Sequence, residues 1–188
     1  KNKISDPTLP MVDSGTTSDI PKNLWDISVK SIDGKEATMG DFRKTAKAFL
    51  FVNVASACGF TSSNYKGLVE LWDKYNSKGL EIFGFPCNQF GAQESECEAD
   101  IKNFVVTRYK VEFPMFSKIE VNGANAHPVY KYLTHNSELY DKETGKVKPL
   151  SWNFCQFLVD KDGKVVKFFS QTKDLSKHEE EIAKLLSQ

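Results

Sequence analysis

Residues 48–85 read AFLFVNVASACGFTSSNYKGLVELWDKYNSKGLEIFGF, and this stretch decides the fold. It opens with an apolar run over 48–55 that is too short for a typical buried helix and is rich in strand-forming residues. Between residues 65 and 75, large side chains recur at steps of three and four, as on one face of a helix. A second apolar run, 80–85, follows Gly79, and a glycine is common just after a helix end. The stretch therefore predicts a strand, a helix and a second strand, joined by a right-handed crossover.

Hydrophobic spacing on either side of this unit predicts the remaining elements. They are a strand over 24–29 with a turn at Asp33-Gly34, helices over 101–109 and 129–133, a hairpin of strands over 154–159 and 165–169, and a helix over 182–186. A strand–helix–strand unit followed by a hairpin and a last helix is typical of small α/β sheets. We therefore predict an α/β, thioredoxin-like fold, in which a central mixed β-sheet is flanked by helices on both faces.

Residues 1–22 contain three prolines and the small polar run 14–18, but few large apolar side chains that could anchor them. This composition predicts a flexible leader. Residues 23–188 suit a single domain, because a chain of 188 residues can bury a core without disulfide or metal staples.

Charge and hydropathy exclude two classes of partner. The 25 cationic and 25 anionic side chains cancel, so no basic field steers the protein to nucleic acid or anionic lipid. Only two of the cationic residues, Arg43 and Arg108, are arginines, so bidentate phosphate clamps are scarce. No apolar run approaches the roughly 20 residues that cross a bilayer. We expect no nucleic-acid partner and no stable membrane insertion.

The four cysteines lack CxxC spacing, which argues against a dithiol exchanger or a disulfide scaffold. Cys58 follows the first buried strand and precedes the helix, where backbone N–H groups and the helix dipole favour thiolate. Thr61 stands where a dithiol enzyme would carry its second cysteine. From the residues alone, a reactive thiol and a buried structural cysteine are equal alternatives at Cys58. A lone reactive thiol suits attack on an electrophile, with a thiol from elsewhere resolving the product.

The loop after the second strand carries three amide side chains, Asn88, Gln89 and Gln93. Ligands of open α/β sheets bind beyond the carboxyl ends of strands, where this loop and Cys58 both lie. Loop amides are more often solvated or turn-forming than catalytic. Trp152 opens the late hairpin, and a tryptophan is usually a core residue with an N–H that needs a partner.

Three segments closely resemble the signature blocks of glutathione peroxidases: 53–61 (NVASACGFT), 85–94 (FPCNQFGAQE) and 152–154 (WNF). The blocks occur in the family's order and spacing, and the resemblance runs from about Leu24 to the C-terminus. It implies a thioredoxin fold and a single peroxidase domain. It also implies that Cys58 is the peroxidatic residue and that Gln93, Trp152 and Asn153 surround it as the other members of a catalytic tetrad.

The chemistry of such a tetrad is coherent. Amide and indole N–H groups carry no charge of their own, so they can hydrogen-bond a thiolate and stabilise charge on a peroxide oxygen. Cys58 would attack the O–O bond of hydrogen peroxide or of an organic or lipid hydroperoxide, release water or an alcohol, and become a sulfenic acid. This reaction requires no metal and no organic cofactor.

The reductant depends on the other thiols. Family members that use thioredoxin-like partners usually carry a resolving cysteine where this chain has Val106. Cys97, nine residues earlier, is a possible resolving residue, although its neighbours Glu96 and Glu98 disfavour thiolate. Direct attack by glutathione is the other route, but glutathione-preferring members tend to line the site with arginine. We expect a thioredoxin-like protein or glutathione as reductant, and we interpret Cys87 and Cys155 as packing residues.

Two other functions compete with a peroxidase. A peroxide sensor that passes a disulfide to a partner protein would use the same Cys58 chemistry. A zinc site built from Cys58, Cys87, Cys97 and a histidine lacks the usual paired ligand spacing. Surface or capping roles are expected for the histidines, and the run 178–181 is interpreted as the solvated face of the last helix.

The region between Leu133 and Pro149 has no long insertion of the kind that tetrameric family members use for assembly, so the resemblance favours a monomer. We expect a cytoplasmic protein, with an organelle or secretion as alternatives.

Overall fold

The computed structural model describes residues 9–13 and 19–188, so most of the predicted leader, residues 1–8 and 14–18, lies outside the described residues. Within that leader, β1 (Val12–Asp13) pairs with β7 (Lys146–Val147), which also pairs with β6 (Tyr140–Asp141). These three short strands form a small sheet apart from the main one.

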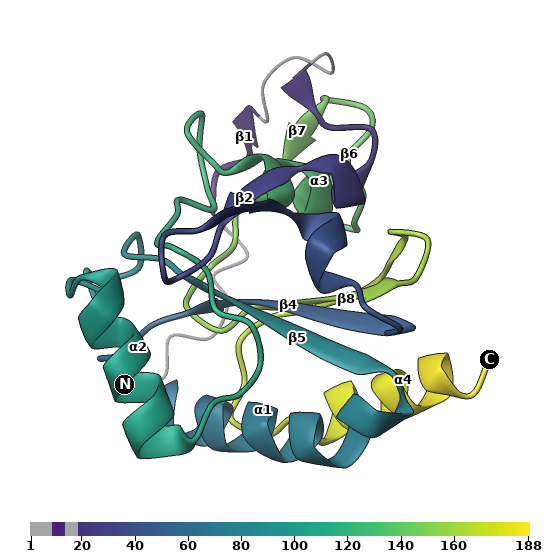
Figure 1. The fold of residues 1–188 in the computed structure, drawn as a ribbon. Helices are drawn as coiled ribbons and strands as arrows, with labels where there is room; N and C mark the ends of the chain where they lie inside the picture. Colours follow the sequence, from purple (N-terminus) through teal and green to yellow (C-terminus); the bar gives the residue numbers. More distant parts are fainter. Residues whose placement is uncertain (1–8, 14–18) are drawn as a thin grey trace.

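The central sheet has four strands in the order β5-β4-β8-β9 (Figure 1). They are β4 (Ala48–Val54), β5 (Leu80–Pro86), β8 (Gln156–Asp160) and β9 (Val165–Phe169). The pair β4–β5 is parallel and the other two pairs are antiparallel, so the sheet is mixed. Both predicted units, the strand–helix–strand crossover and the late hairpin, are present.

Helices cover both faces of this sheet (Figure 1). The helix α1 (Thr61–Tyr75), with the short 3-10 helix η4 (Asn76–Lys78) after it, connects β4 to β5. It lies beside α4 (Ser176–Leu186) on one face, whereas α3 (Pro128–His135) lies on the other and α2 (Glu98–Tyr109) lies near one end of the sheet. This arrangement confirms the predicted thioredoxin-like fold.

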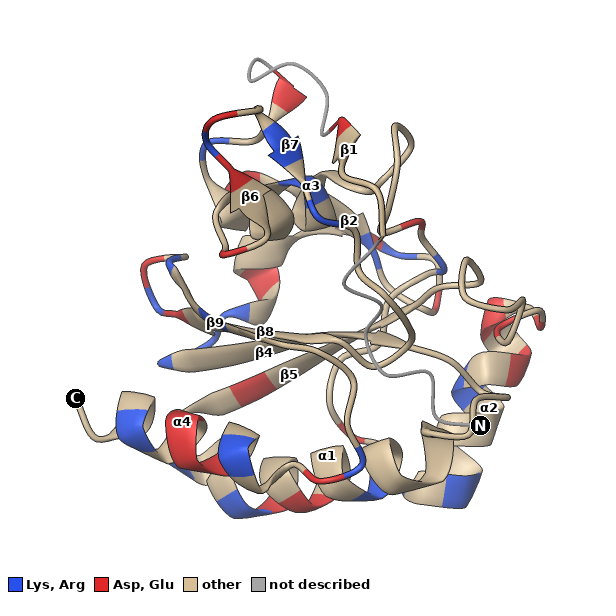
Figure 2. Cartoon of the chain, turned by 180° about the vertical axis from the view of Figure 1, so that it is seen from behind, with Lys and Arg blue, Asp and Glu red and all other residues tan. Residues whose placement is uncertain are grey.

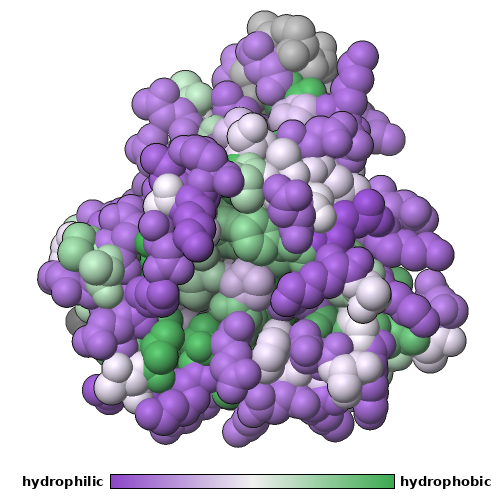
Figure 3. Space-filling model, in the orientation of Figure 1, coloured by the Kyte–Doolittle hydropathy of each residue, from purple (hydrophilic) through white to green (hydrophobic). Residues whose placement is uncertain are grey.

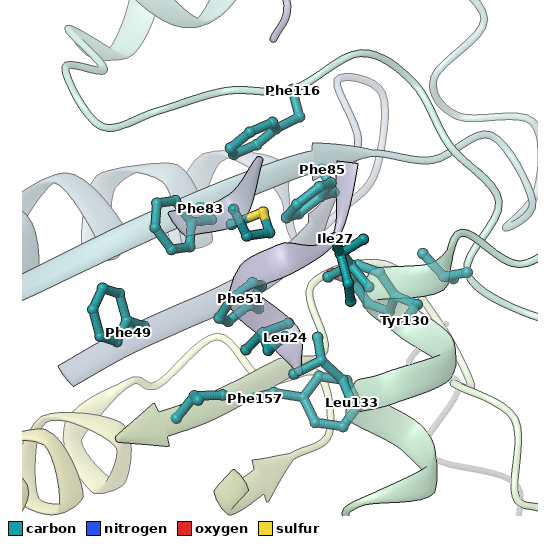
Figure 4. Close-up of a cluster of buried hydrophobic side chains, with 14 of the residues drawn as sticks. Leu24, Ile27, Phe49, Phe51, Phe83, Phe85, Phe116, Tyr130, Leu133 and Phe157 are labelled. Carbon is teal, nitrogen blue, oxygen red and sulfur yellow. The ribbon is translucent and has the colours of Figure 1, made fainter. Parts of the chain in front are cut away.

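The core consists of two hydrophobic layers because side chains of β4 point alternately to the two faces. Phe49 and Phe51 join the layer toward α3, where Figure 4 shows them with Leu24 and Leu133. Leu50 and its neighbours join the layer under α1 and α4. Each fully buried side chain of this size contributes about 1.5–3 kcal/mol, so β4, buried along its whole length, fixes the frame that carries the site.

The prediction of a strand over 24–29 is only half right. Residues 24–26 form the 3-10 helix η2 (Leu24–Asp26), and β2 (Ser28–Lys30) then pairs with β3 (Glu36–Thr38), which leads into η3 (Met39–Phe42). The Asn23 side chain caps η2 by accepting a hydrogen bond from Trp25 N at 3.1 Å. Leu24 and Trp25 are both buried, which a strand cannot achieve for consecutive residues on one face.

The interpretation of residues 178–181 as a solvated face is wrong for His178. This side chain is 2% exposed, stacks on Phe169 with ring centroids 3.9 Å apart, and its Nδ1 lies 2.7 Å from Gln156 Oε1. Burial lowers the pKa of His178 to about 4. The helical period puts His178 on the same face as buried Ile182, whereas Glu180 faces solvent. By contrast His127 caps α3 as expected, since its Nδ1 accepts from Val129 N at 3.1 Å.

Acidic and basic residues are interspersed along the chain's helices, strands and loops (Figure 2), in keeping with the balanced charge. In the view of Figure 1, hydrophobic side chains gather in a hollow near the centre of the face (Figure 3). Within residues 9–13 and 19–188, no helix is both long and apolar enough to cross a membrane.

Candidate active site

Cys58 lies in a tight turn between β4 and α1. The residue is half-buried, and its sulfur accepts a hydrogen bond from Phe60 N at 3.4 Å. The Thr61 hydroxyl holds the turn on both sides, because it accepts from Cys58 N at 3.0 Å and donates to Ala55 O at 2.8 Å. Thr61 therefore has a structural role of its own, because its hydroxyl fixes the backbone of the turn that carries Cys58.

The loop that follows β5 docks directly on this turn. The Gln93 carbonyl oxygen accepts hydrogen bonds from Ser56 N at 3.2 Å and from Ala57 N at 3.0 Å. The loop turns back through two residues with left-handed backbone, Gly91 (φ +68°) and Ala92 (φ +52°). A Cβ at Gly91 would lie 3.2 Å from the Trp152 ring, so a glycine fits both the conformation and the close approach.

The third block, residues 152–154, is tied to the same place by Asn53 of β4. Asn53 Nδ2 donates to Trp152 O at 3.0 Å, and Phe154 N donates to Asn53 O at 2.7 Å. Asn153 Nδ2 then donates to Gln93 Oε1 at 2.9 Å. The three sequence blocks, far apart in the chain, therefore meet at the carboxyl end of β4.

The structure brings the predicted site residues together to different degrees. The Asn153 bond occupies the carbonyl oxygen of Gln93 and leaves the Gln93 amide hydrogens as donors. Trp152 contacts the loop through its ring, 6.1 Å from the Phe90 ring between centroids. Within the described part of the chain, the hydrogen bond to Cys58 Sγ comes from Phe60 N rather than from these three side chains.

The remaining thiols differ from Cys58 in their surroundings. Cys87 and Cys155 are fully buried, and burial raises the pKa of both, that of Cys87 to about 11. Cys97 is exposed at the start of α2, and its Sγ donates to Asp100 Oδ2 at 3.2 Å. Among residues 9–13 and 19–188, no three His, Cys, Asp or Glu side chains gather to hold a metal.

Sequence reasoning missed Glu94 as a site residue. It is 1% exposed, and its Oε2 accepts from Ser56 N at 2.5 Å. The signal that could have found it is a single acidic residue at the end of a loop of amides, directly after Gln93.

A half-buried cysteine at the start of a helix in a thioredoxin-like fold, with a hydrogen-bonded carboxamide pair nearby and a threonine in place of a second cysteine, defines a single-thiol oxidoreductase.

Comparison with known proteins identifies the family. The family model for glutathione peroxidase matches residues 24–134. The chain is 46% identical over 166 residues to "Phospholipid hydroperoxide glutathione peroxidase 1, chloroplastic" of Arabidopsis thaliana, covering 88% of this chain and 67% of that protein. It is also 46% identical over 166 residues to "Glutathione peroxidase homolog BsaA" of Bacillus subtilis, covering 88% and 99%. The crystal structure of T. cruzi GPX1 superposes with a TM-score of 0.66 at 32% identity, covering 88% of this chain and 97% of that one.

The chain therefore belongs to the glutathione peroxidase family. It is a thiol-dependent peroxidase that reduces hydroperoxides, as the resemblance of its three blocks predicted. The comparisons do not favour the alternative of a peroxide sensor.

Proposed function

We propose that Cys58 is the peroxidatic nucleophile and that Gln93, Trp152 and Asn153 stabilise the charges of the reaction. The observation that carries this proposal is the setting of Cys58, which is half-buried, lies at the start of α1 and accepts the Phe60 N–H through its sulfur. Backbone donors at a helix N-terminus favour the thiolate, which is the nucleophilic form. The hydrogen-bonded pair Gln93–Asn153 offers uncharged donors beside the same turn.

In the proposed first step, the Cys58 thiolate attacks the terminal oxygen of the hydroperoxide. A sulfur–oxygen bond forms, the O–O bond breaks, and the leaving oxygen takes up a proton as water or an alcohol. The sulfur is oxidised by two electrons to the sulfenic acid. Donors aimed at the developing oxyanion lower the barrier most when they are already oriented, which is what the Asn153 bond does for the Gln93 amide.

The sulfenic acid is returned to the thiol by two reducing thiol groups. The first forms a disulfide with Cys58 and releases water, and the second displaces Cys58 from that disulfide. Buried Cys87 and Cys155 are poor candidates for the first thiol. Cys97 is exposed, but its S–H already donates a hydrogen bond to the Asp100 carboxylate of α2. We therefore propose an external thiol, from a thioredoxin-like protein or glutathione, as the main route and Cys97 as the intramolecular alternative.

We propose hydrogen peroxide and organic or lipid hydroperoxides as substrates. The phospholipid hydroperoxide in the name of the Arabidopsis relative supports the lipid substrate. We further propose a monomer without a nucleic-acid partner, in keeping with the balanced surface charge. The four free thiols suit the cytoplasm, and the chloroplastic relative makes an organelle the alternative.

Steady-state hydroperoxide consumption tests this proposal, with glutathione in one series and a thioredoxin system in the other. We expect turnover with at least one donor, and Cys97→Ser should retain it if an external thiol resolves Cys58. Loss of turnover in Cys97→Ser would assign resolution to Cys97. A wild-type protein that consumes no hydroperoxide with either donor would refute the proposed function.

A further inference from the structure

We propose that Glu94 is a positioning residue for the peroxidase reaction, because its buried carboxylate holds the turn that carries Cys58 against the loop that carries Gln93. This inference rests on the proposed role of Cys58 and adds a residue that touches neither the substrate nor the sulfur.

The geometry makes Glu94 a clamp between the two segments. Its Oε2 accepts Ser56 N at 2.5 Å, and the preceding carbonyl, Gln93 O, accepts the same N–H at 3.2 Å and that of Ala57 at 3.0 Å. The clamp is itself anchored, because Glu94 N donates to Asn88 Oδ1 at 2.9 Å. A charged acceptor makes a stronger hydrogen bond than a neutral one. The distance between the Cys58 turn and the Gln93 side chain therefore depends on the Glu94 carboxylate.

Buried polar atoms without partners distinguish Glu94 from a carboxylate that only stabilises the fold. Glu94 Oε1 and Tyr65 OH are buried and have no hydrogen-bond partner within the described residues. The charge of Glu94 adds to burial in raising the pKa of Tyr65, so the hydroxyl feels the carboxylate. Buried polar atoms without partners cost stability. Two such atoms, coupled through the charge of Glu94 and next to the segment that carries Cys58, point to a role in the reaction rather than in folding.

The ionisation of Glu94 changes the free energy of unfolding in a direction that its pKa shift defines. Burial raises the pKa of Glu94, opposed by hydrogen bonding from Ser56 and by the charge of Lys118. The native state therefore binds the carboxyl proton more tightly than the unfolded chain does. Above the native pKa, ionised Glu94 lowers the free energy of unfolding relative to a neutral side chain. Replacing Glu94 with glutamine removes this cost and also removes the charged acceptor, so stability and activity should move in opposite directions.

The charged and titratable groups around Glu94 come from three segments. Tyr65 lies on α1, Cys87 and Glu96 lie in the same loop as Glu94, and Lys118 lies in the segment after α2. Tyr65 and Cys87 are neutral at neutral pH because burial raises the pKa of each. The group whose protonation changes the clamp as the pH falls is therefore Glu94 itself, because burial raises its pKa.

Glu81 provides a matched control. It is another buried carboxylate, 2% exposed, whose Oε1 accepts from Ile82 N at 3.1 Å and from Trp72 Nε1 at 3.0 Å. Burial raises its pKa as it does for Glu94. It lies at the start of β5, where it is in register with Phe49 of β4, at the end opposite to the Cys58 turn.

The experiment compares wild type, Glu94→Gln and Glu81→Gln in single-turnover oxidation by a hydroperoxide between pH 5 and 9, together with thermal unfolding at pH 8. Glu94→Gln should react about tenfold more slowly, as small displacements of reacting groups cost at least this much, without a lower Tm. Its rate should follow a single ionisation with pH, whereas the wild-type rate falls more steeply in acid because Glu94 also protonates. Glu81→Gln should react like wild type.

Several results would overturn the proposal. They are a Glu94→Gln rate within about twofold of wild type, an equal loss in Glu81→Gln, or a loss accompanied by a lower Tm, which marks a structural role. If Glu94→Gln does not fold, Glu94→Asp retains the charge with a shorter reach, and an unchanged rate in that variant contradicts the clamp. If hydroperoxide does not oxidise Cys58 in the wild-type protein, the proposed function itself is refuted. This result differs from every result that would refute only the role of Glu94.

Discussion

Two cysteines of this protein stand at helix N-termini, and their sulfurs meet opposite partners. Cys58, before α1, accepts a hydrogen bond from Phe60 N, whereas Cys97, before α2, donates one to the carboxylate of Asp100. Both sulfurs lie near the positive end of a helix dipole. The contacts on the sulfurs differ, because Cys58 Sγ faces a backbone donor and Cys97 Sγ faces a charged acceptor.

The comparison shows that the position at a helix start is not what selects the reactive thiol. Around Cys58, donors and backbone ties come from three distant segments, 53–61, 85–94 and 152–154. Around Cys97, the hydrogen-bond partner of the sulfur is Asp100 of the helix that Cys97 precedes. A reactive site is therefore built by long-range contacts on top of a local preference.

The largest expected effect is the loss of the first turnover in Cys58→Ser, since a serine hydroxyl cannot be oxidised to the sulfenic acid. Consumption of one equivalent of hydroperoxide, followed without added reductant, measures it. Cys97→Ser is the matched control and should consume the equivalent at the wild-type rate. If Cys97→Ser loses the first turnover and Cys58→Ser retains it, Cys97 rather than Cys58 is the reactive thiol.

Next in size is Asn153→Ala, which removes the bond that orients the Gln93 amide. Loss of an oriented donor of this kind typically costs about 10²-fold in rate, and the second-order rate of Cys58 with hydroperoxide should fall accordingly. Asn136→Ala is the control, because Asn136 Nδ2 likewise donates one hydrogen bond of 2.9 Å, to the backbone carbonyl of Tyr132, but lies at the end of α3. Equal rates in the two variants would contradict the role of the Gln93–Asn153 pair.

Thr61→Val should have a smaller effect, because valine keeps the shape and loses only the hydroxyl that holds the Cys58 turn. Losing such hydrogen bonds costs about 1–1.5 kcal/mol, so we expect an oxidation rate about tenfold lower. The control is Thr134→Val, in which an equally buried hydroxyl that bonds Tyr130 O is removed far from the site. A slower Cys58 reaction in the control would attribute the effect to general destabilisation.

The smallest effect is expected for Asp100→Asn, which removes the carboxylate from Cys97. A charge interaction of about 1 kcal/mol at a helix terminus corresponds to about fivefold faster alkylation of Cys97 by iodoacetamide at neutral pH. Cys58 in the same sample is the internal reference and should react at its wild-type rate. No change at Cys97 would mean that the Asp100 contact does not set its reactivity.

The sequence alone predicts the frame of this molecule because the frame follows from periodicity. The apolar runs of β4 and β5 and the spacing along α1 are local signals, and the structure confirms them. The predicted helices begin too late, since the first turns of α2 and α4 are polar and carry no apolar period. Capping by Asn23 and the burial of His178 against Gln156 were not predictable, because each depends on a specific polar contact.

The sequence identifies the residues of the candidate site, in three blocks, but it does not predict how they are arranged in space. The resemblance to glutathione peroxidases picks out Cys58, Gln93, Trp152 and Asn153. The ties that assemble them, made by Asn53, Thr61 and Glu94, join segments far apart in the chain and leave no spacing pattern in the sequence.

The most direct test of whether Cys58 is the peroxidatic residue is to locate the first sulfur that hydroperoxide oxidises. The wild-type protein is mixed with one equivalent of hydroperoxide in the presence of dimedone, which traps sulfenic acids, and the four cysteine peptides are analysed by mass spectrometry. We expect the adduct on Cys58, with Cys87, Cys97 and Cys155 as free thiols. An adduct on Cys97 with Cys58 unmodified would contradict this expectation.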